Sequence, residues 1–161
     1  MPGVDYSLRV AAPQDLPTLL QFEQGIVQWE RPFAPHLKPD PVSYYDIAAL
    51  MERDDAQVLV AVSPSGELMG SGYAKIKRNI PYKQPDMLAY LGFMYIAPQH
   101  RGRGLNAAVI EGLKEWAALR GVHEVQLDVY ADNTSALSAY EKAGFKPDML
   151  TMRLQAPSLQ R

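Results

Sequence analysis

The segment Gln99–Gly104 combines two glycines with two arginines just before a stretch with helical spacing. Gly102 and Gly104 lack a Cβ, so the backbone there can approach an anion closely. The first N–H groups of a helix have no acceptor within the helix, and the helix dipole places partial positive charge there. Arg101 and Arg103 add positive charge at the same end. The segment therefore predicts a loop that binds a pyrophosphate at the start of a helix.

The same residues also satisfy a dinucleotide-binding pattern, with Ala107 in the third small position and Asp128 near the end of the next predicted strand. A dinucleotide fold usually places this pattern first in a series of parallel strand–helix–strand units. Here about 100 residues precede the loop and only about 57 follow Gly104, too few for a doubly wound sheet. We therefore disfavour a nicotinamide or flavin oxidoreductase.

A second group of residues with chemical potential lies further along the chain, at Asn133 and Tyr140. They are seven residues apart, which places both on one face of a helix, two turns apart. A phenol can act as a general acid, and a carboxamide can bind a ligand through hydrogen bonds. The structural alternatives are an N-cap for Asn133 and a core aromatic for Tyr140.

The elements that must position these residues follow from the hydrophobic periodicity. Strands are predicted at 7–11, 57–62, 67–77, 87–96, 124–130 and 149–154, and helices at 13–28, 42–53, 102–120 and 133–142. Ser63–Gly66 is typical of an antiparallel hairpin turn, whereas the unit around the loop requires a parallel crossover. The order predicts an α/β fold with a mixed, mostly antiparallel central sheet and one parallel crossover.

Length and composition are typical of one globular domain spanning residues 1–161. A net charge of −2 does not indicate the excess of basic residues that is typical of nucleic-acid-binding proteins. No apolar run is long enough to span a bilayer. The absence of cysteine excludes disulfides, thiolate metal sites and cysteine nucleophiles. The first residues show no basic or apolar targeting pattern. We therefore expect a cytoplasmic protein that binds no nucleic acid, membrane or metal.

Taken together, the two motifs resemble those of the GCN5-related N-acetyltransferase (GNAT) superfamily. The resemblance covers the order of elements over nearly the whole chain, and it is specific at Ala97-Pro98-x-x-Arg101-Gly102-x-Gly104 and Asn133-x-x-Ala136-x-x-x-Tyr140-x-x-x-Gly144-Phe145. It implies a single acyltransferase domain whose sheet strands splay apart at the coenzyme A site. It also implies an N-acetyltransferase that moves the acetyl group of acetyl-CoA to a primary amine of a small molecule or peptide by direct attack.

The resemblance also implies roles for individual residues. Backbone groups of Met94 and Ile96 would bind the pantetheine amides, and backbone N–H groups from Arg101 to Asn106 would bind the pyrophosphate. Asn133 would reach the pantetheine from the other wall, and Tyr140 would be the general acid that protonates the coenzyme A thiolate. The expected cofactor-binding residues are Met94, Tyr95, Ile96, Gln99, Arg101, Gly102, Arg103, Gly104, Leu105, Asn106, Asn133 and Tyr140.

The general base is not identified by the sequence. Many relatives carry a carboxylate in the strand before the loop, but residues 90–95 read Tyr-Leu-Gly-Phe-Met-Tyr. Position leaves Tyr90, Asp86, Glu30 and His36 as candidates, or a water chain, or an amine that arrives neutral. The missing carboxylate also leaves open a non-catalytic acyl-CoA sensor or interaction module of the same fold, although Tyr140 favours an enzyme.

The acceptor side is expected between about Gln24 and Tyr45, by the same resemblance. Aromatic residues and carboxylates gather in this region, which suits a cationic amine, a small metabolite or a peptide N-terminus, although helix packing with solvated charges explains the composition equally well. The resemblance also allows a homodimer paired through the last predicted strand, since relatives are often dimers.

Overall fold

One five-stranded sheet forms the centre of the first part of the chain, as the computed structural model, which describes residues 5–159, shows. Its strands lie in the order β1-β2-β3-β4-β5, and all neighbours are antiparallel except β4 and β5, which are parallel. This confirms the predicted mixed sheet with one parallel crossover. The bounds are β1 (Ser7–Val10), β2 (Ala56–Val62), β3 (Leu68–Arg78), β4 (Met87–Ile96) and β5 (Val125–Gln126).

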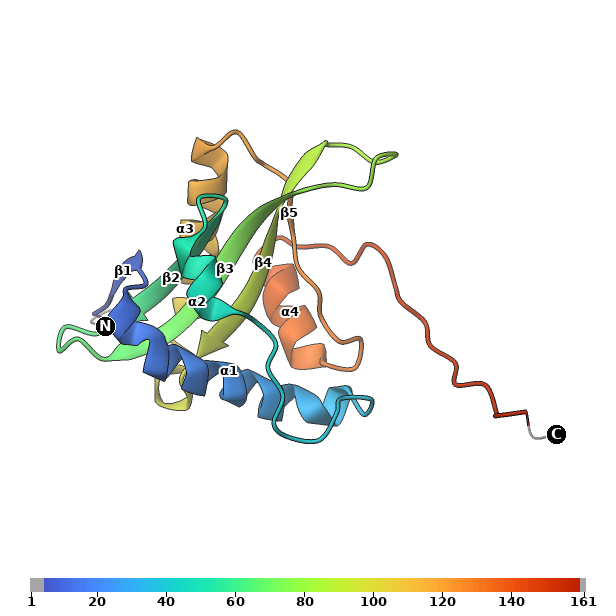
Figure 1. Cartoon of the computed structure of the whole chain (residues 1–161). Coiled ribbons are helices and arrows are strands. Elements are labelled where there is room, and N and C mark those ends of the chain that lie inside the picture. Colours follow the sequence, from blue (N-terminus) through green and yellow to red (C-terminus); the bar gives the residue numbers. More distant parts are fainter. Residues whose placement is uncertain (1–4, 160–161) are drawn as a thin grey trace. The chain divides into compact units, whose positions relative to one another are not determined.

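Helices cover both faces of this sheet (Figure 1). α1 (Leu16–Glu30) and α2 (Ile47–Glu52) pack on one face, and α3 (Leu105–Leu119) packs on the other. Gly72 in β3 lies so close to α3 that a Cβ added there would lie 2.8 Å from Val109. Short 3-10 helices occupy Pro13–Asp15, Arg31–Phe33 and Pro98–His100.

The chain divides into two compact units, Met1–Asp128 and Val129–Arg161. The second unit contains α4 (Thr134–Lys142). The single domain expected over residues 1–161 stays a prediction. No helix within residues 5–159 is long and apolar enough to cross a membrane.

An irregularity in β4 changes its course near the middle of the sheet. The register with β3 shifts between Ser71 and Tyr73, and Phe93 adopts a φ of 58°, which is uncommon for a residue with a side chain. The buried Ser71 hydroxyl donates to the Phe93 carbonyl at 3.1 Å, and the Phe93 N–H donates to the Tyr45 hydroxyl at 3.3 Å. Side chains on β3 and next to α2 therefore hold the bulge in place.

The parallel pairing of β4 with β5 is short. It joins Ala89 to Val125 and Tyr90 to Gln126, whereas β4 continues to Ile96. The two strands thus part after Tyr90, which is the separation that the predicted splayed strands require. We call the point where they part the fork. β5 was predicted at 124–130 and is shorter than that.

The strand predicted at 149–154 is wrong. Residues 145–159 form neither a helix nor a strand, and the large apolar side chains from Met149 to Leu159 are exposed. A strand needs a neighbour that pairs with its backbone N–H and C=O groups. Among the described residues of the second unit there is no other strand. The homodimer that depended on this strand stays a prediction.

Two helices begin later than predicted, for identifiable reasons. α3 begins at Leu105 rather than at 102, because Gly102 and Gly104 have φ angles of 77° and 80°. α2 begins at Ile47 rather than at 42, because the N–H groups of Tyr44 and Tyr45 donate to the carboxylate of Glu23 instead.

Glu23 therefore gives a testable prediction about stability. Its side chain is 2% exposed, and its Oε2 accepts from the N–H groups of Tyr44 at 2.9 Å and Tyr45 at 2.8 Å. Glu23→Ala would leave both donors without this acceptor, so we expect a loss of about 2–4 kcal/mol in the free energy of unfolding by urea. Glu52→Ala, at an exposed position of α2, is the control and should change it by less than about 0.5 kcal/mol. Equal stability of the two variants would contradict the role of Glu23.

Candidate active site

The loop between β4 and α3 presents a group of unpaired backbone donors. The first hydrogen bond that leads into α3 runs from Ala108 to the carbonyl of Gly104, at 3.2 Å. Within residues 5–159, the N–H groups from Gly102 to Ala107 donate to no acceptor. A Cβ on Gly102 or Gly104 would meet no atom within 4 Å, so their positive φ angles, rather than crowding, require glycine. The loop thus opens onto free space at the positive end of a 15-residue helix.

Glu67 ties this loop to the turn between β2 and β3. Its Oε1 accepts from Nε2 of Gln99 at 3.2 Å and lies 3.4 Å from Nε2 of His100. The hydrogen bond from Gln99 and, to a smaller extent, that from His100 hold the pKa of Glu67 below its ordinary value. The Gln99 amide, which was expected at the cofactor, is directed toward Glu67 in this structure.

The two arginines of the loop differ in their surroundings. The Arg101 guanidinium lies over the rings of Trp29, at 5.1 Å, and Tyr95, at 5.6 Å, and its Nε donates to the Ile96 carbonyl at 2.9 Å. Arg101 therefore links the loop to α1. Arg103 is exposed and forms no ion pair within the described part of the chain, so its charge is available to an anion at the loop.

The free edge of β4 lies beside the loop. The N–H of Ala97 donates to Met69 on β3 at 2.9 Å. Because alternate residues of a strand direct their backbone groups to opposite edges, those of Ile96 and Met94 face the edge where β5 has ended. No strand therefore pairs with the backbone groups that are expected to bind the pantetheine amides. The Arg101 side chain does contact the Ile96 carbonyl.

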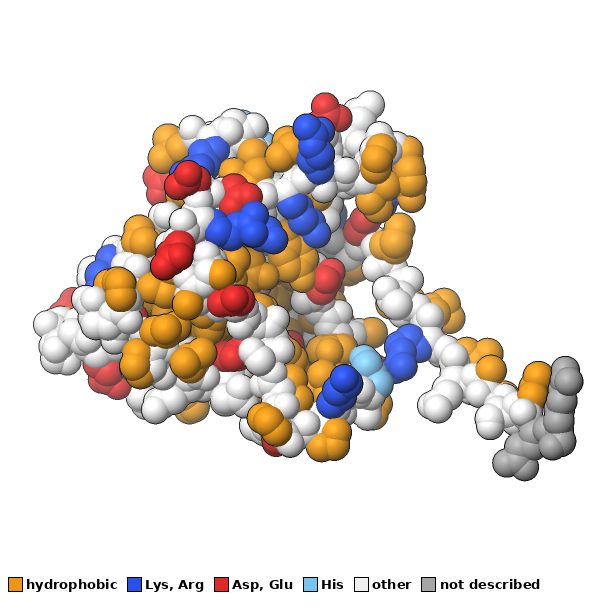
Figure 2. Space-filling model, in the orientation of Figure 1, with side chains coloured by type: hydrophobic (Ala, Val, Ile, Leu, Met, Phe, Trp, Pro, Cys, Tyr) orange, Lys and Arg blue, Asp and Glu red, His pale blue; other side chains and the backbone are white. Residues whose placement is uncertain are grey.

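Aromatic rings line the face of the sheet that carries α1 and α2. The Tyr45 ring lies 5.5 Å from the rings of both Tyr73 and Phe93 and 5.7 Å from that of Tyr44. We call this group, together with Tyr90, the aromatic face. Figure 2 shows the side of the molecule that carries α1 and α2, where apolar side chains lie among acidic and basic ones.

The four candidate bases differ in burial and in position. Burial raises the pKa values of Tyr45, Tyr73 and Tyr90, so these phenols are neutral near pH 7. Asp86 precedes β4, so the ten-residue strand separates it by about 33 Å from the loop after Ile96. Glu30 is half-buried, and burial raises its pKa while the neighbouring Tyr44 hydroxyl opposes that effect. His36 is exposed in the irregular segment before α2.

Asp128 is a carboxylate of this region that the sequence associated only with a dinucleotide. Its Oδ2 accepts a hydrogen bond of 2.8 Å from the hydroxyl of Tyr90. The sequence contains one signal for this pair: Gln126 is the neighbour of Tyr90 in the sheet, and Asp128 follows two residues later on the same side. That signal is readable only when the register of β4 and β5 is known.

The second unit holds the remaining two expected site residues. Asn133 is 5% exposed and caps α4, because its Oδ1 accepts from the N–H of Ala136 at 3.2 Å. The half-buried Tyr140 lies on α4, and its ring packs edge-on against Phe145 with a centroid distance of 5.8 Å. Gly144, with a φ of 103°, makes the turn between them. The N-cap alternative for Asn133 is therefore present, and its ligand role stays a prediction.

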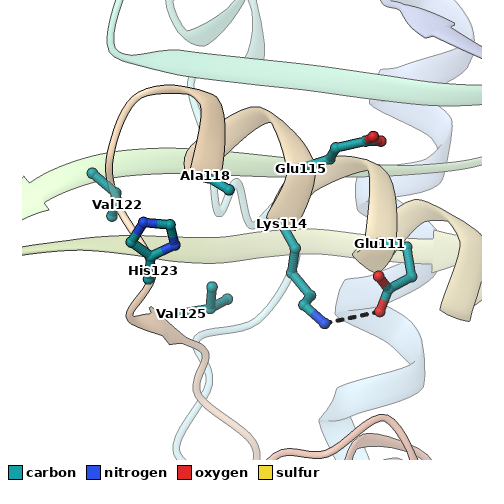
Figure 3. A pocket seen from close by; sticks show the side chains of 7 residues that line it. All are labelled: Glu111, Lys114, Glu115, Ala118, Val122, His123 and Val125. Atoms are coloured by element: carbon teal, nitrogen blue, oxygen red, sulfur yellow. Dashed lines mark hydrogen bonds and ion pairs between the residues drawn. The ribbon is translucent and has the colours of Figure 1, made fainter.

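The first unit also has a pocket (Figure 3). It lies between the C-terminal half of α3 and the start of β5, and an ion pair of 2.9 Å from Lys114 to Glu111 borders it. None of the expected site residues lines it. The lining residues are Glu111, Lys114, Glu115, Ala118, Val122, His123 and Val125.

A mixed sheet with a fork, beside a glycine-rich loop at a helix N-terminus, is the architecture that the GNAT resemblance predicted. The sequence model of the acetyltransferase (GNAT) family matches residues 23–145. The chain therefore belongs to this family.

Individual relatives share part of the sequence. Over 90 residues the chain is 32% identical to an aminoglycoside N(6′)-acetyltransferase type 1 of Klebsiella aerogenes. The aligned region covers 56% of this chain and 59% of that protein. Over 119 residues it is 33% identical to a mycothiol acetyltransferase of Renibacterium salmoninarum. This aligned region covers 70% of this chain and 34% of that protein. The matches thus span less than two thirds of the length of each of these relatives.

The fold also matches solved structures. A tetramutant of a Bacillus halodurans protein superposes with a TM-score of 0.83 at 19% identity, over 93% of this chain and 99% of that one. At this identity the likeness concerns the fold, and it agrees with the sheet and helices described above.

The tyrosines of the aromatic face give a prediction about pH. A phenol with a raised pKa stabilises the fold below its unfolded pKa near 10, and this contribution is lost as pH rises toward the folded pKa. An absorbance titration at 295 nm follows the ionisation of the phenols. Tyr45→Phe and Tyr90→Phe should each remove only signal that develops at the highest pH. If Tyr90→Phe instead lost signal near the ordinary pKa of tyrosine, the raised pKa of Tyr90 would be contradicted.

Proposed function

We propose that this chain is an acetyl-CoA-dependent N-acetyltransferase that acts on a primary amine. The observation that carries the proposal is the run of free N–H groups from Gly102 to Ala107 at the N-terminus of α3. Such a run binds the oxygens of a phosphate or pyrophosphate, and Arg103 adds an unpaired charge. Family membership and the two relatives named as acetyltransferases support acetyl-CoA as the source of that pyrophosphate.

The edge of β4 supports the same donor. The backbone groups of Met94 and Ile96 face the fork and are not paired with β5, so they are available to the amides of a pantetheine arm. A backbone N–H on this edge would polarise the thioester carbonyl. The Arg101 side chain would have to release the Ile96 carbonyl if that group binds a ligand.

The reaction requires little covalent chemistry from the protein. A neutral amine nitrogen attacks the thioester carbonyl carbon and becomes positively charged. The carbon–sulfur bond then breaks, and the nitrogen loses one proton to give the neutral amide. We assign Tyr140 as the acid that gives a proton to the departing thiolate, and Asn133 as a ligand of the pantetheine. A half-buried phenol on α4, next to Phe145, is suitable for a proton donor.

Binding of acetyl-CoA is the first test. Gly104→Ala places a side chain at a φ of 80° within the loop, and Gly66→Ala does the same at 92° in the β2–β3 turn, with open space at both. Both variants should lose about 1 kcal/mol of stability. In calorimetric titrations, only Gly104→Ala should weaken acetyl-CoA binding, by tenfold or more, and NAD should not bind the wild-type chain. Failure of the wild-type chain to bind acetyl-CoA would overturn the proposal.

Turnover separates the enzyme from the sensor alternative. We expect thiol release from acetyl-CoA when a primary amine is added, and Tyr140→Phe should lower kcat by tenfold or more while weakening acetyl-CoA binding much less. Tight binding with no thiol release from any amine would instead favour the sensor. Normal turnover by Tyr140→Phe would exclude this residue as the acid.

A further inference from the structure

The pair formed by Tyr90 and Asp128 has no role in the donor site described above. Its hydrogen bond joins residues 38 positions apart, at 2.8 Å from the phenol oxygen to Oδ2. The pair lies at the fork, because Tyr90 belongs to the last paired position of β4 and β5. Asp128 is therefore the first carboxylate after β5 on the side of the sheet that carries the aromatic face.

The Asp128 carboxylate is held in one orientation and still has capacity to bind. Burial, together with the hydrogen bond to Asp128, raises the pKa of Tyr90, so the phenol stays neutral and donates its proton in the hydrogen bond. A neutral donor orients the carboxylate without cancelling its charge. Asp128 is exposed, and its Oδ1 forms no hydrogen bond within residues 5–159. One oxygen of a fixed anion thus faces solvent beside the fork.

The chain itself places an ammonium group over the Tyr90 ring. The Lys77 ammonium lies 4.7 Å from the centroid of the Tyr90 ring. A cation over a phenol ring is attracted by the ring quadrupole. The raised pKa of Tyr73 is due first to burial and second to the negative charge of Asp128, which places that carboxylate near a second ring of the aromatic face.

We propose that Asp128, held by Tyr90 as a positioning residue, binds the ammonium group of a cationic acceptor. This inference rests on the proposed function, and it names the chemical class of the acceptor: a primary alkylamine, protonated in solution, whose carbon chain packs on the aromatic rings. The carboxylate attracts the ammonium to the fork, where the amine releases one proton to solvent before it attacks the thioester. A neutral or anionic acceptor gains nothing from Asp128.

The control for Asp128 is a carboxylate on the other face of the sheet. Glu115 is exposed on α3, which packs on that face. Glu115→Gln is therefore the control for Asp128→Asn, because each removes one negative charge with little change of shape.

The experiment measures amine binding directly, so that it does not depend on turnover. The probes are 1,4-diaminobutane and phenethylamine, with 1,4-butanediol as the neutral control, titrated calorimetrically into the chain in the presence of coenzyme A. Wild type should bind the amines and not the diol. Asp128→Asn should weaken amine binding tenfold or more and leave the Kd for acetyl-CoA unchanged, and Glu115→Gln should change amine binding less than threefold.

Further variants test the roles of Tyr90 and Lys77. Tyr90→Phe should weaken amine binding less than Asp128→Asn, and the double variant should bind no worse than Asp128→Asn alone, because Tyr90 acts through the carboxylate. Lys77→Met should not weaken amine binding, since it removes a competing ammonium. Additive losses in the double variant would reduce Tyr90 to a packing role and contradict its positioning role.

The outcomes separate this inference from the proposed function. Wild-type amine binding by Asp128→Asn, or failure of both amines to bind the wild-type chain, would overturn the inference. Amine binding that depends on Asp128 without thiol release would uphold it and contradict the transferase proposal. If Asp128→Asn released thiol at the wild-type rate, the transferase proposal would be upheld and the role of Asp128 would be contradicted.

Discussion

The short pairing of β4 with β5 is the constraint on which the rest of the structure depends. Only two residue pairs join these strands, and β4 then runs on for six residues without its parallel neighbour. The bulge at Phe93, fixed by Ser71 and Tyr45, sets the course of β4 beyond that point. A continuous ladder would occupy the backbone groups of Met94 and Ile96 and leave no edge for a ligand.

The fork separates two environments with opposite chemistry. On the loop side, free N–H groups and Arg103 attract phosphate oxygens. On the aromatic face, Asp128 and Glu30 lie next to neutral phenols, a setting for a cation. An acetyltransferase requires this arrangement, since its donor is a polyanion and an amine acceptor is positively charged in solution. Arg101 connects the two sides through Trp29, Tyr95 and Ile96.

Local patterns in the sequence predicted the parts of the fold that local physics determines. β4 has its predicted bounds, because an apolar run ending before Pro98 leaves no ambiguity, and glycines at 102 and 104 identify the loop. The strand expected at 149–154 failed because alternation does not supply a pairing partner. α2 was predicted too long because Glu23, some 20 residues away, takes the N–H groups of Tyr44 and Tyr45. The Tyr90–Asp128 pair was missed for the same reason: it depends on sheet register.

The central claim is that the free N–H groups of the loop bind the pyrophosphate of acetyl-CoA. The most direct measurement is a residue-resolved map of backbone amide chemical shifts recorded during titration with coenzyme A. This account predicts that the largest changes fall on the amides from Gly102 to Ala107, with further changes at Met94 and Ile96. Changes concentrated instead on the pocket between α3 and β5, from Glu111 to Val125, would contradict it.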